Sequence, residues 1–235
     1  MRQFYNRSEK HRLLIDVAFA IIAFTLYSFI PLVIMIDPSQ AFYYSIAALI
    51  LAFVFFLLCY RFIRRLNPSF QIKHVKPSYA IGIILATLIG SFILQSIIGQ
   101  LRFWLLPEEA STSNQQSIAG MLQVDSLLFY SFVTIVFIAP LFEEFIFRRV
   151  LIGHLFAPQK ILQFRIALSL VIFALLHVFS EVSNGVLPFL FSLITYLIVS
   201  GCFTIIYVKT GRMLYSVIAH ILNNALAAIM LFSTL

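Results

Sequence analysis

Long apolar segments recur along this chain of 235 residues and are separated by short stretches that carry most of its charge. Each segment is close to the length of about 20 residues that an α-helix needs to cross the hydrocarbon of a bilayer. Hydrophobic residues make up 62% of the chain and charged residues 11%, which leaves too little polar surface for a water-soluble domain. We therefore predict an all-α fold, a polytopic transmembrane helical bundle of about seven spans, with a range of roughly six to eight. The predicted spans are residues 13–36, 42–60, 80–98, 126–155, 161–179, 187–208 and 213–232.

The distribution of cations predicts the orientation of the bundle, because Lys and Arg in short loops stay on the cytoplasmic side. With the N-terminus in the cytoplasm, all of the 16 Lys and Arg residues except Arg102 fall on or near the inner face. The net charge of +7 is then explained by topology and by anionic lipid headgroups, and no nucleic-acid partner is expected. We predict a multi-pass protein of a plasma membrane whose first apolar segment is an anchored helix rather than a cleaved signal peptide.

A few ionisable and amide side chains lie deep inside the predicted spans, where they are costly and usually serve a function or a specific pairing. They lie on the fourth, fifth and seventh spans. The members of this deep polar set are Glu143, Glu144, Arg148, His177, His220, Asn223 and Asn224.

In the fourth span, Glu144 and Arg148 are four residues apart on a helix and close enough to form an ion pair. Glu143 points about 100° away from Glu144, so it is free to face a polar cavity. The alternative is that both acids and Arg148 form one buried cluster that only holds helices together.

The other two spans add histidines with a partner on the same helix face. Phe173 lies four residues before His177 and can fix its ring, and His220 shares a face with Asn224, whereas Asn223 is turned away. A single histidine could equally be a core residue bonded to a carbonyl. Together, however, a carboxylate, two histidines and a carboxamide can activate a water and stabilise an oxyanion, which favours hydrolysis.

These residues form three motifs that resemble those of the CAAX protease and bacteriocin-processing family of intramembrane proteases. The motifs are Glu-Glu-x-x-x-Arg, Phe-x-x-x-His and His-x-x-x-Asn/Asp, and here they read EEFIFR at 143–148, FALLH at 173–177 and HILNN at 220–224. The resemblance covers residues 126–235, which we expect to form a catalytic helical region. Residues 1–125 carry no motif of the family and complete one integrated membrane domain.

The resemblance implies proteolysis inside the membrane, with a peptide or a membrane protein as the substrate. Glu143 and His177 would activate the water, His220 and Asn224 would stabilise the oxyanion, and Glu144, Arg148 and Phe173 would support the site. Family members are commonly labelled metalloproteases, yet a metal-free glutamate mechanism has also been described. A zinc site would have to use Glu143, His177 and His220 from three helices, because His-Glu-x-x-His is absent. The cofactor is therefore left open between zinc and no metal, with the second preferred.

Two other functions use the same residues. Deep acids and histidines also relay protons in transporters, although an inverted repeat is absent here and only Pro140 suggests a broken helix. A non-catalytic membrane scaffold or immunity protein would keep the fold for binding alone. Many bacterial members of the family look like factors for bacteriocin self-immunity or peptide maturation, and the compact, positive-inside chain resembles that branch.

Overall fold

The computed structural model describes residues 18, 21–22, 25, 38–66, 75–107, 111–123, 128–153 and 159–232. At positions 38, 41, 55–56 and 58–66 it describes the backbone alone. The described residues form helices and short connections without any strand, so the predicted all-α class is confirmed. The first predicted span, residues 13–36, lies largely outside the described residues.

Helices account for nearly every described residue. The α-helices are α2 (Ala41–Leu66), α3 (Pro77–Leu105), α4 (Ser113–Leu122), α5 (Leu128–Val133), α6 (Ala139–Glu144), α7 (Gln159–Val178), α8 (Val186–Thr210) and α9 (Met213–Phe232). The 3-10 helices are η1 (Pro38–Gln40) and η6 (Phe179–Asn184), and the π-helices are η4 (Thr134–Ile138) and η5 (Phe145–Ile152).

Within the described part of the chain, five helical segments are long and apolar enough to cross a membrane. They are Pro77–Leu105, Leu128–Ile152, Gln159–Asn184, Val186–Thr210 and Met213–Phe232. Each corresponds to one predicted span, and α2 covers the predicted span 42–60 with an apolar stretch at Phe42–Val54. The polytopic bundle predicted from the apolar segments is therefore confirmed.

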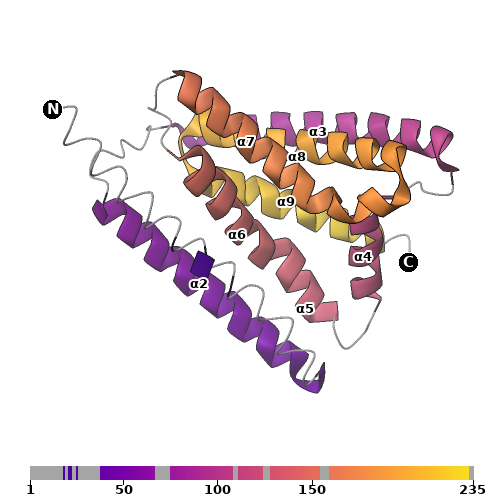
Figure 1. The fold of residues 1–235 in the computed structure, drawn as a ribbon. Coiled ribbons are helices and arrows are strands. Elements are labelled where there is room, and N and C mark those ends of the chain that lie inside the picture. Colours follow the sequence, from indigo (N-terminus) through magenta and orange to yellow (C-terminus); the bar gives the residue numbers. More distant parts are fainter. Residues whose placement is uncertain are drawn as a thin grey trace.

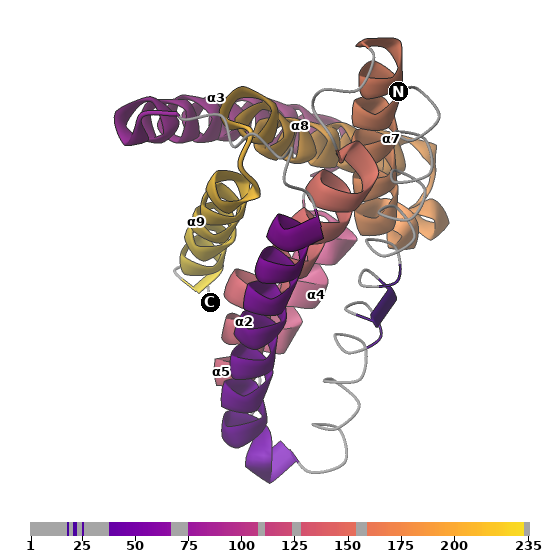
Figure 2. The ribbon, with the colours of Figure 1, turned by 90° about the vertical axis from the view of Figure 1, so that its left-hand side faces the viewer.

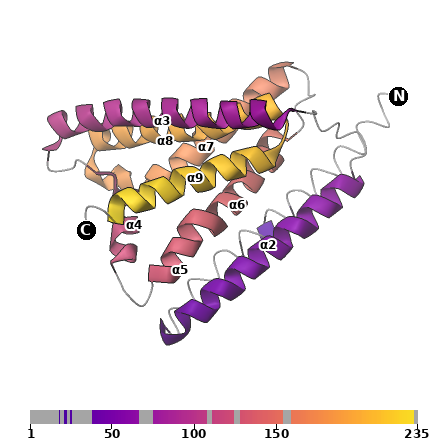
Figure 3. The same ribbon diagram turned by 180° about the vertical axis from the view of Figure 1, so that it is seen from behind.

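The helices pack around α8, which contacts α3, α7 and α9. Helix α3 runs along α8 at one edge of the molecule, and α9 lies between that edge and the α5–α6 rod (Figures 1 and 3). Helix α2 forms the opposite edge and packs beside α5 (Figure 2). The short helix α4 lies near the ends of α5, α7 and α9, where it crosses the bundle.

The fourth span is a single rod, Leu128–Ile152, in which two π-helical segments interrupt the α-helix. The N–H of Ala139 bonds to the carbonyl of Thr134, five residues back, immediately before Pro140. Proline has no N–H and its ring crowds the preceding turn, so a wider turn at this point relieves the clash. The break suggested by Pro140 is thus a change of helical register, and the rod continues through it.

The core beneath the polar residues is apolar and is shared by five helical segments, of which α3 contributes Ile84 and Leu88. Phe147 of η5, Phe173 of α7, Phe203 of α8 and Ala219 of α9 are all buried in one cluster. Many other large apolar side chains of the spans are exposed on the outside of the bundle, where they would face lipid. The polar residues therefore lie where α6, η5, α7, α8 and α9 meet.

Candidate active site

The predicted ion pair of the fourth span is present and completely buried. Arg148 Nε lies 3.1 Å from Glu144 Oε2, and both side chains are 0% exposed. Their spacing of four residues is maintained although the register changes from α-helix to π-helix between them. The expectation that Glu144 pairs with Arg148 is confirmed.

The remaining nitrogens of Arg148 bind two serines of neighbouring helices. Nη1 donates to Ser169 Oγ at 3.1 Å, and Nη2 donates to the carbonyl of Ser200 at 3.2 Å. Ser169 in turn donates to the carbonyl of Phe147 at 2.9 Å. The guanidinium therefore ties η5 to α7 and α8, which gives the ion pair a structural role as well as an electrostatic one.

Glu143, the residue next to Glu144, faces both histidines. Its Oε2 atom is 3.7 Å from His177 Nε2 and 3.7 Å from His220 Nε2. The side chain is 24% exposed, as against 21% for His177 and 3% for His220. The structure thus brings together three of the four predicted catalytic residues, and two of them are open on one side.

Hydrogen bonds at the far side of each ring define which nitrogen carries the proton. His177 Nδ1 lies 2.8 Å from the carbonyl of Phe173, and a carbonyl only accepts, so Nδ1 is the donor. His220 Nδ1 lies 3.1 Å from Glu144 Oε1, and a carboxylate paired with Arg148 likewise accepts. In the neutral histidines, both Nε2 atoms therefore present lone pairs toward Glu143.

Aromatic rings hold both imidazoles in place. Phe173 stacks on His177 with ring centroids 4.3 Å apart, as its position one turn earlier predicted. Phe203 stacks on His220 at 4.2 Å. A second ring, Tyr196, stacks on the other face of His177 at 4.8 Å. The stacking leaves each imidazole little freedom to rotate away from Glu143.

Asn224 holds the backbone of the fourth span. Its Nδ2 donates to the carbonyl of Ile135 at 2.9 Å. That carbonyl is available because the N–H of Ala139 bonds to Thr134 instead, and Pro140, the next residue, has no N–H to offer. Asn223, which we expected to be turned away, is buried and donates to Asn224 Oδ1 at 3.2 Å. The two amides are therefore linked, and Asn224 lies against the broken turn.

A bound zinc ion would need three protein donors at about 2.0–2.2 Å from one point. Glu143, His177 and His220 have the right chemistry for such a set. Among the residues that the structure describes, however, no group of three His, Cys, Asp or Glu side chains is arranged to hold a metal ion. The arrangement seen here does not fit a metal.

Several residues of the site escaped the sequence analysis. Ser169, Tyr196 and Ser200 are polar groups within apolar spans, a pattern that marks helix contacts in membranes, but their partners lie on other helices. Phe203 and the carbonyl of Ile135 carry no sequence signal at all, because one is an ordinary apolar residue and the other is backbone.

Comparisons with known proteins agree with the motifs. Residues 125–226 match the family described as Type II CAAX prenyl endopeptidase Rce1-like. The chain is also similar to a protein of Bacillus subtilis (strain 168) named "Putative membrane peptidase YdiL". The two are 25% identical over 185 residues, which cover 77% of this chain and 70% of the relative. No solved structure matches the chain.

Proposed function

Because residues 125–226 match the family of Type II CAAX prenyl endopeptidases and the chain is similar to a protein named as a membrane peptidase, we propose that it is an endopeptidase in which Glu143 activates a water inside the membrane. One observation carries the proposal. Glu143 Oε2 is buried and makes no hydrogen bond with the described residues, yet it lies 3.7 Å from two histidine nitrogens. While both histidines are neutral, three acceptor atoms thus lie close together, and this arrangement suits a molecule that can donate protons to them.

A water at this point would donate one hydrogen to Glu143 Oε2 and the other to His177 Nε2. As the water oxygen attacks the peptide carbonyl, its proton passes to Glu143, a C–O bond forms and the carbonyl oxygen takes up the negative charge. Protonated Glu143 then delivers the proton to the departing amine, and the C–N bond breaks. The exposure of Glu143 and His177 supports this assignment, since a peptide can approach only the open side of the site.

The oxyanion would be stabilised from the α9 side of the site. His220 can donate from Nε2 to the oxyanion only when both ring nitrogens carry protons, with Nδ1 directed to Glu144 Oε1 at 3.1 Å. Asn224 uses one amide hydrogen for Ile135 and has a second to offer. We therefore assign oxyanion stabilisation to these two residues and the holding of the site to Glu144, Arg148 and Phe173.

The proposal includes a location and a substrate class. The cation distribution supports a plasma-membrane protein of bacterial type with a cytoplasmic N-terminus. A site inside the bundle suits a peptide or a membrane-associated segment as substrate, in bacteriocin self-immunity or in peptide maturation. Elemental analysis and chelation test the metal-free mechanism, because stoichiometric zinc whose removal and return switch cleavage off and on would overturn it.

The function is tested by comparing membranes that carry the wild type or Glu143→Gln. The substitution keeps the shape of the side chain and removes the base, so cleavage per folded molecule should fall by about 10²-fold or more. Proteomics of new peptide termini should then reveal a substrate that persists uncut in the variant. Equal cleavage of that substrate by both purified proteins would exclude Glu143 as the base.

A further inference from the structure

His177 is clamped between two aromatic rings that come from different helices. Phe173, on the same helix, stacks on one face with an interplanar angle of 22°. Tyr196, on α8, stacks on the other face at 4.8 Å and 26°. Phe173 is fixed by α7 itself and is buried, whereas Tyr196 is half-buried and needs another contact to define its position.

That contact comes from α4. The Nδ2 atom of Asn114 donates to the hydroxyl of Tyr196 at 2.7 Å, although the two residues are 82 positions apart. Asn114 is the second residue of α4, and the start of this helix is fixed by a reciprocal cap. The N–H of Gln115 donates to Thr112 Oγ1 at 3.2 Å, and the N–H of Thr112 donates to Gln115 Oε1 at 3.0 Å.

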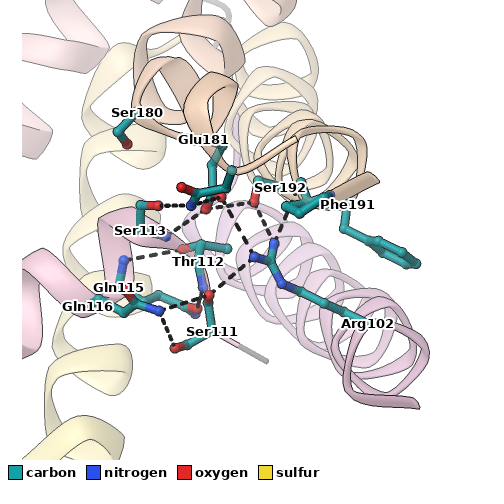
Figure 4. A network of polar contacts seen from close by, with 12 residues as sticks. Arg102, Ser111, Thr112, Ser113, Gln115, Gln116, Ser180, Glu181, Phe191 and Ser192 are labelled. Atoms are coloured by element: carbon teal, nitrogen blue, oxygen red, sulfur yellow. Dashed lines mark hydrogen bonds and ion pairs between the residues drawn. The ribbon is translucent and has the colours of Figure 1, made fainter. Parts of the chain in front are cut away.

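A buried ion pair holds the same helix start against the bundle (Figure 4). Glu181 Oε1 accepts from the N–H of Ser113 at 2.6 Å, which places a carboxylate at the positive end of α4. Arg102 lies 3.7 Å from Glu181 Oε2, donates to Ser192 Oγ at 2.7 Å and donates to the carbonyl of Ser111 at 3.2 Å. The start of α4 is therefore tied to α3, η6 and α8.

We propose that Asn114 and Tyr196 are positioning residues that hold the ring of His177 in the orientation needed to face Glu143. The proposal rests on the function proposed above for these two residues. Tyr196 itself does not reach the reacting atoms in this assignment, because its hydroxyl is directed to α4. Tyr196 orients the imidazole of His177 by stacking on it, and Asn114 of α4 in turn fixes the position of Tyr196.

Two substitutions at Tyr196 separate the stacking contact from the hydrogen bond. Tyr196→Phe keeps the ring and loses the bond to Asn114, so we expect kcat to fall about threefold to tenfold with an unchanged KM. Tyr196→Leu removes the ring. It should lower kcat by about tenfold to 100-fold, because a misplacement of about 1 Å at a catalytic group can cost about 10²-fold.

Asn114→Ala should reproduce the effect of Tyr196→Phe, and the double variant should be no slower than the slower single variant, because both changes remove the same bond. Tyr207→Phe is the matched control. Tyr207 lies on α8, as Tyr196 does, and its hydroxyl donates to the carbonyl of Gly153 at 3.0 Å. The substitution removes this hydrogen bond and keeps the ring. It should lower stability without changing kcat per folded molecule.

A measurement independent of activity completes the test. In ¹⁵N-histidine-labelled protein, with the signals assigned through His177→Gln, the ring of His177 should be rigid with its proton on Nδ1 in the wild type and in Tyr207→Phe. In Tyr196→Leu the ring should become mobile on the nanosecond timescale. Unchanged His177 signals and unchanged kcat in Tyr196→Leu, with Glu143→Gln inactive, would overturn the positioning role alone. If Glu143→Gln remained active, the proposed function would fail, and the ring signals would still decide the positioning role.

Discussion

Glu144→Gln tests the division of roles between the two adjacent glutamates. The wild-type carboxylate accepts from His220 Nδ1 at 3.1 Å and pairs with Arg148 Nε at 3.1 Å. A glutamine has one acceptor oxygen and one donor nitrogen. Whichever way the amide is turned, its NH₂ group faces either Arg148 or the protonated Nδ1 of His220. One of the two favourable contacts of the wild-type carboxylate is then replaced by a repulsive contact between two hydrogen-bond donors.

The larger loss is the counter-charge of Arg148. Both side chains of the pair are 0% exposed, so water cannot compensate the guanidinium. Removing one partner of a buried ion pair lowers the free energy of unfolding by about 3–5 kcal/mol in soluble proteins. For a chain of this size that corresponds to a decrease of roughly 6–20 °C in Tm. Glu143→Gln should change Tm little, because Glu143 is 24% exposed and its histidine distances are 3.7 Å.

The assay is thermal unfolding of both purified variants in the same detergent, with cleavage measured per folded molecule. The double variant Glu144→Gln with Arg148→Met should recover much of the lost stability, since removing both charges leaves no buried ion unpaired. Ser169 keeps its bond to the carbonyl of Phe147 in that variant. The reasoning is refuted if Glu143→Gln unfolds the protein while Glu144→Gln is as stable as the wild type and inactive.

Three further predictions concern other parts of the molecule. Asn224→Ala leaves the carbonyl of Ile135 without its 2.9 Å donor, so chemical denaturation should show a loss of about 1–3 kcal/mol, and an unchanged midpoint would contradict the bond. Glu181→Gln leaves Arg102 buried without a full counter-charge and weakens the anchor of α4, so hydrogen exchange at the start of α4 should rise; equal exchange would show that the anchor is not needed. An alkaline phosphatase fusion after Leu235 should be active, because the distribution of cations predicts that Leu235 lies outside, and an inactive fusion would mean that one span was miscounted.

The sequence by itself determined the class of the fold and the contacts within single helices. Apolar length alone predicts spans, because backbone groups in hydrocarbon must bond within their own helix. The boundaries of α9 at Met213–Phe232 coincide with the predicted span. The Glu144–Arg148 pair and the Phe173–His177 stack were also predictable, since residues four apart on a helix meet regardless of the rest of the molecule.

Contacts between helices were decided only by the tertiary structure. Helical periodicity says which residues share a face but not which face of another helix they meet. The approach of both histidines to Glu143, the clamp of Tyr196 on His177, and the Arg102–Glu181 pair all depend on packing between distant segments. The hydrogen bond from Asn224 to the carbonyl of Ile135 also depends on the π-turn before Pro140, which leaves that carbonyl without its usual helical donor. Backbone groups carry no side-chain identity, so no pattern of residues could have indicated that partner.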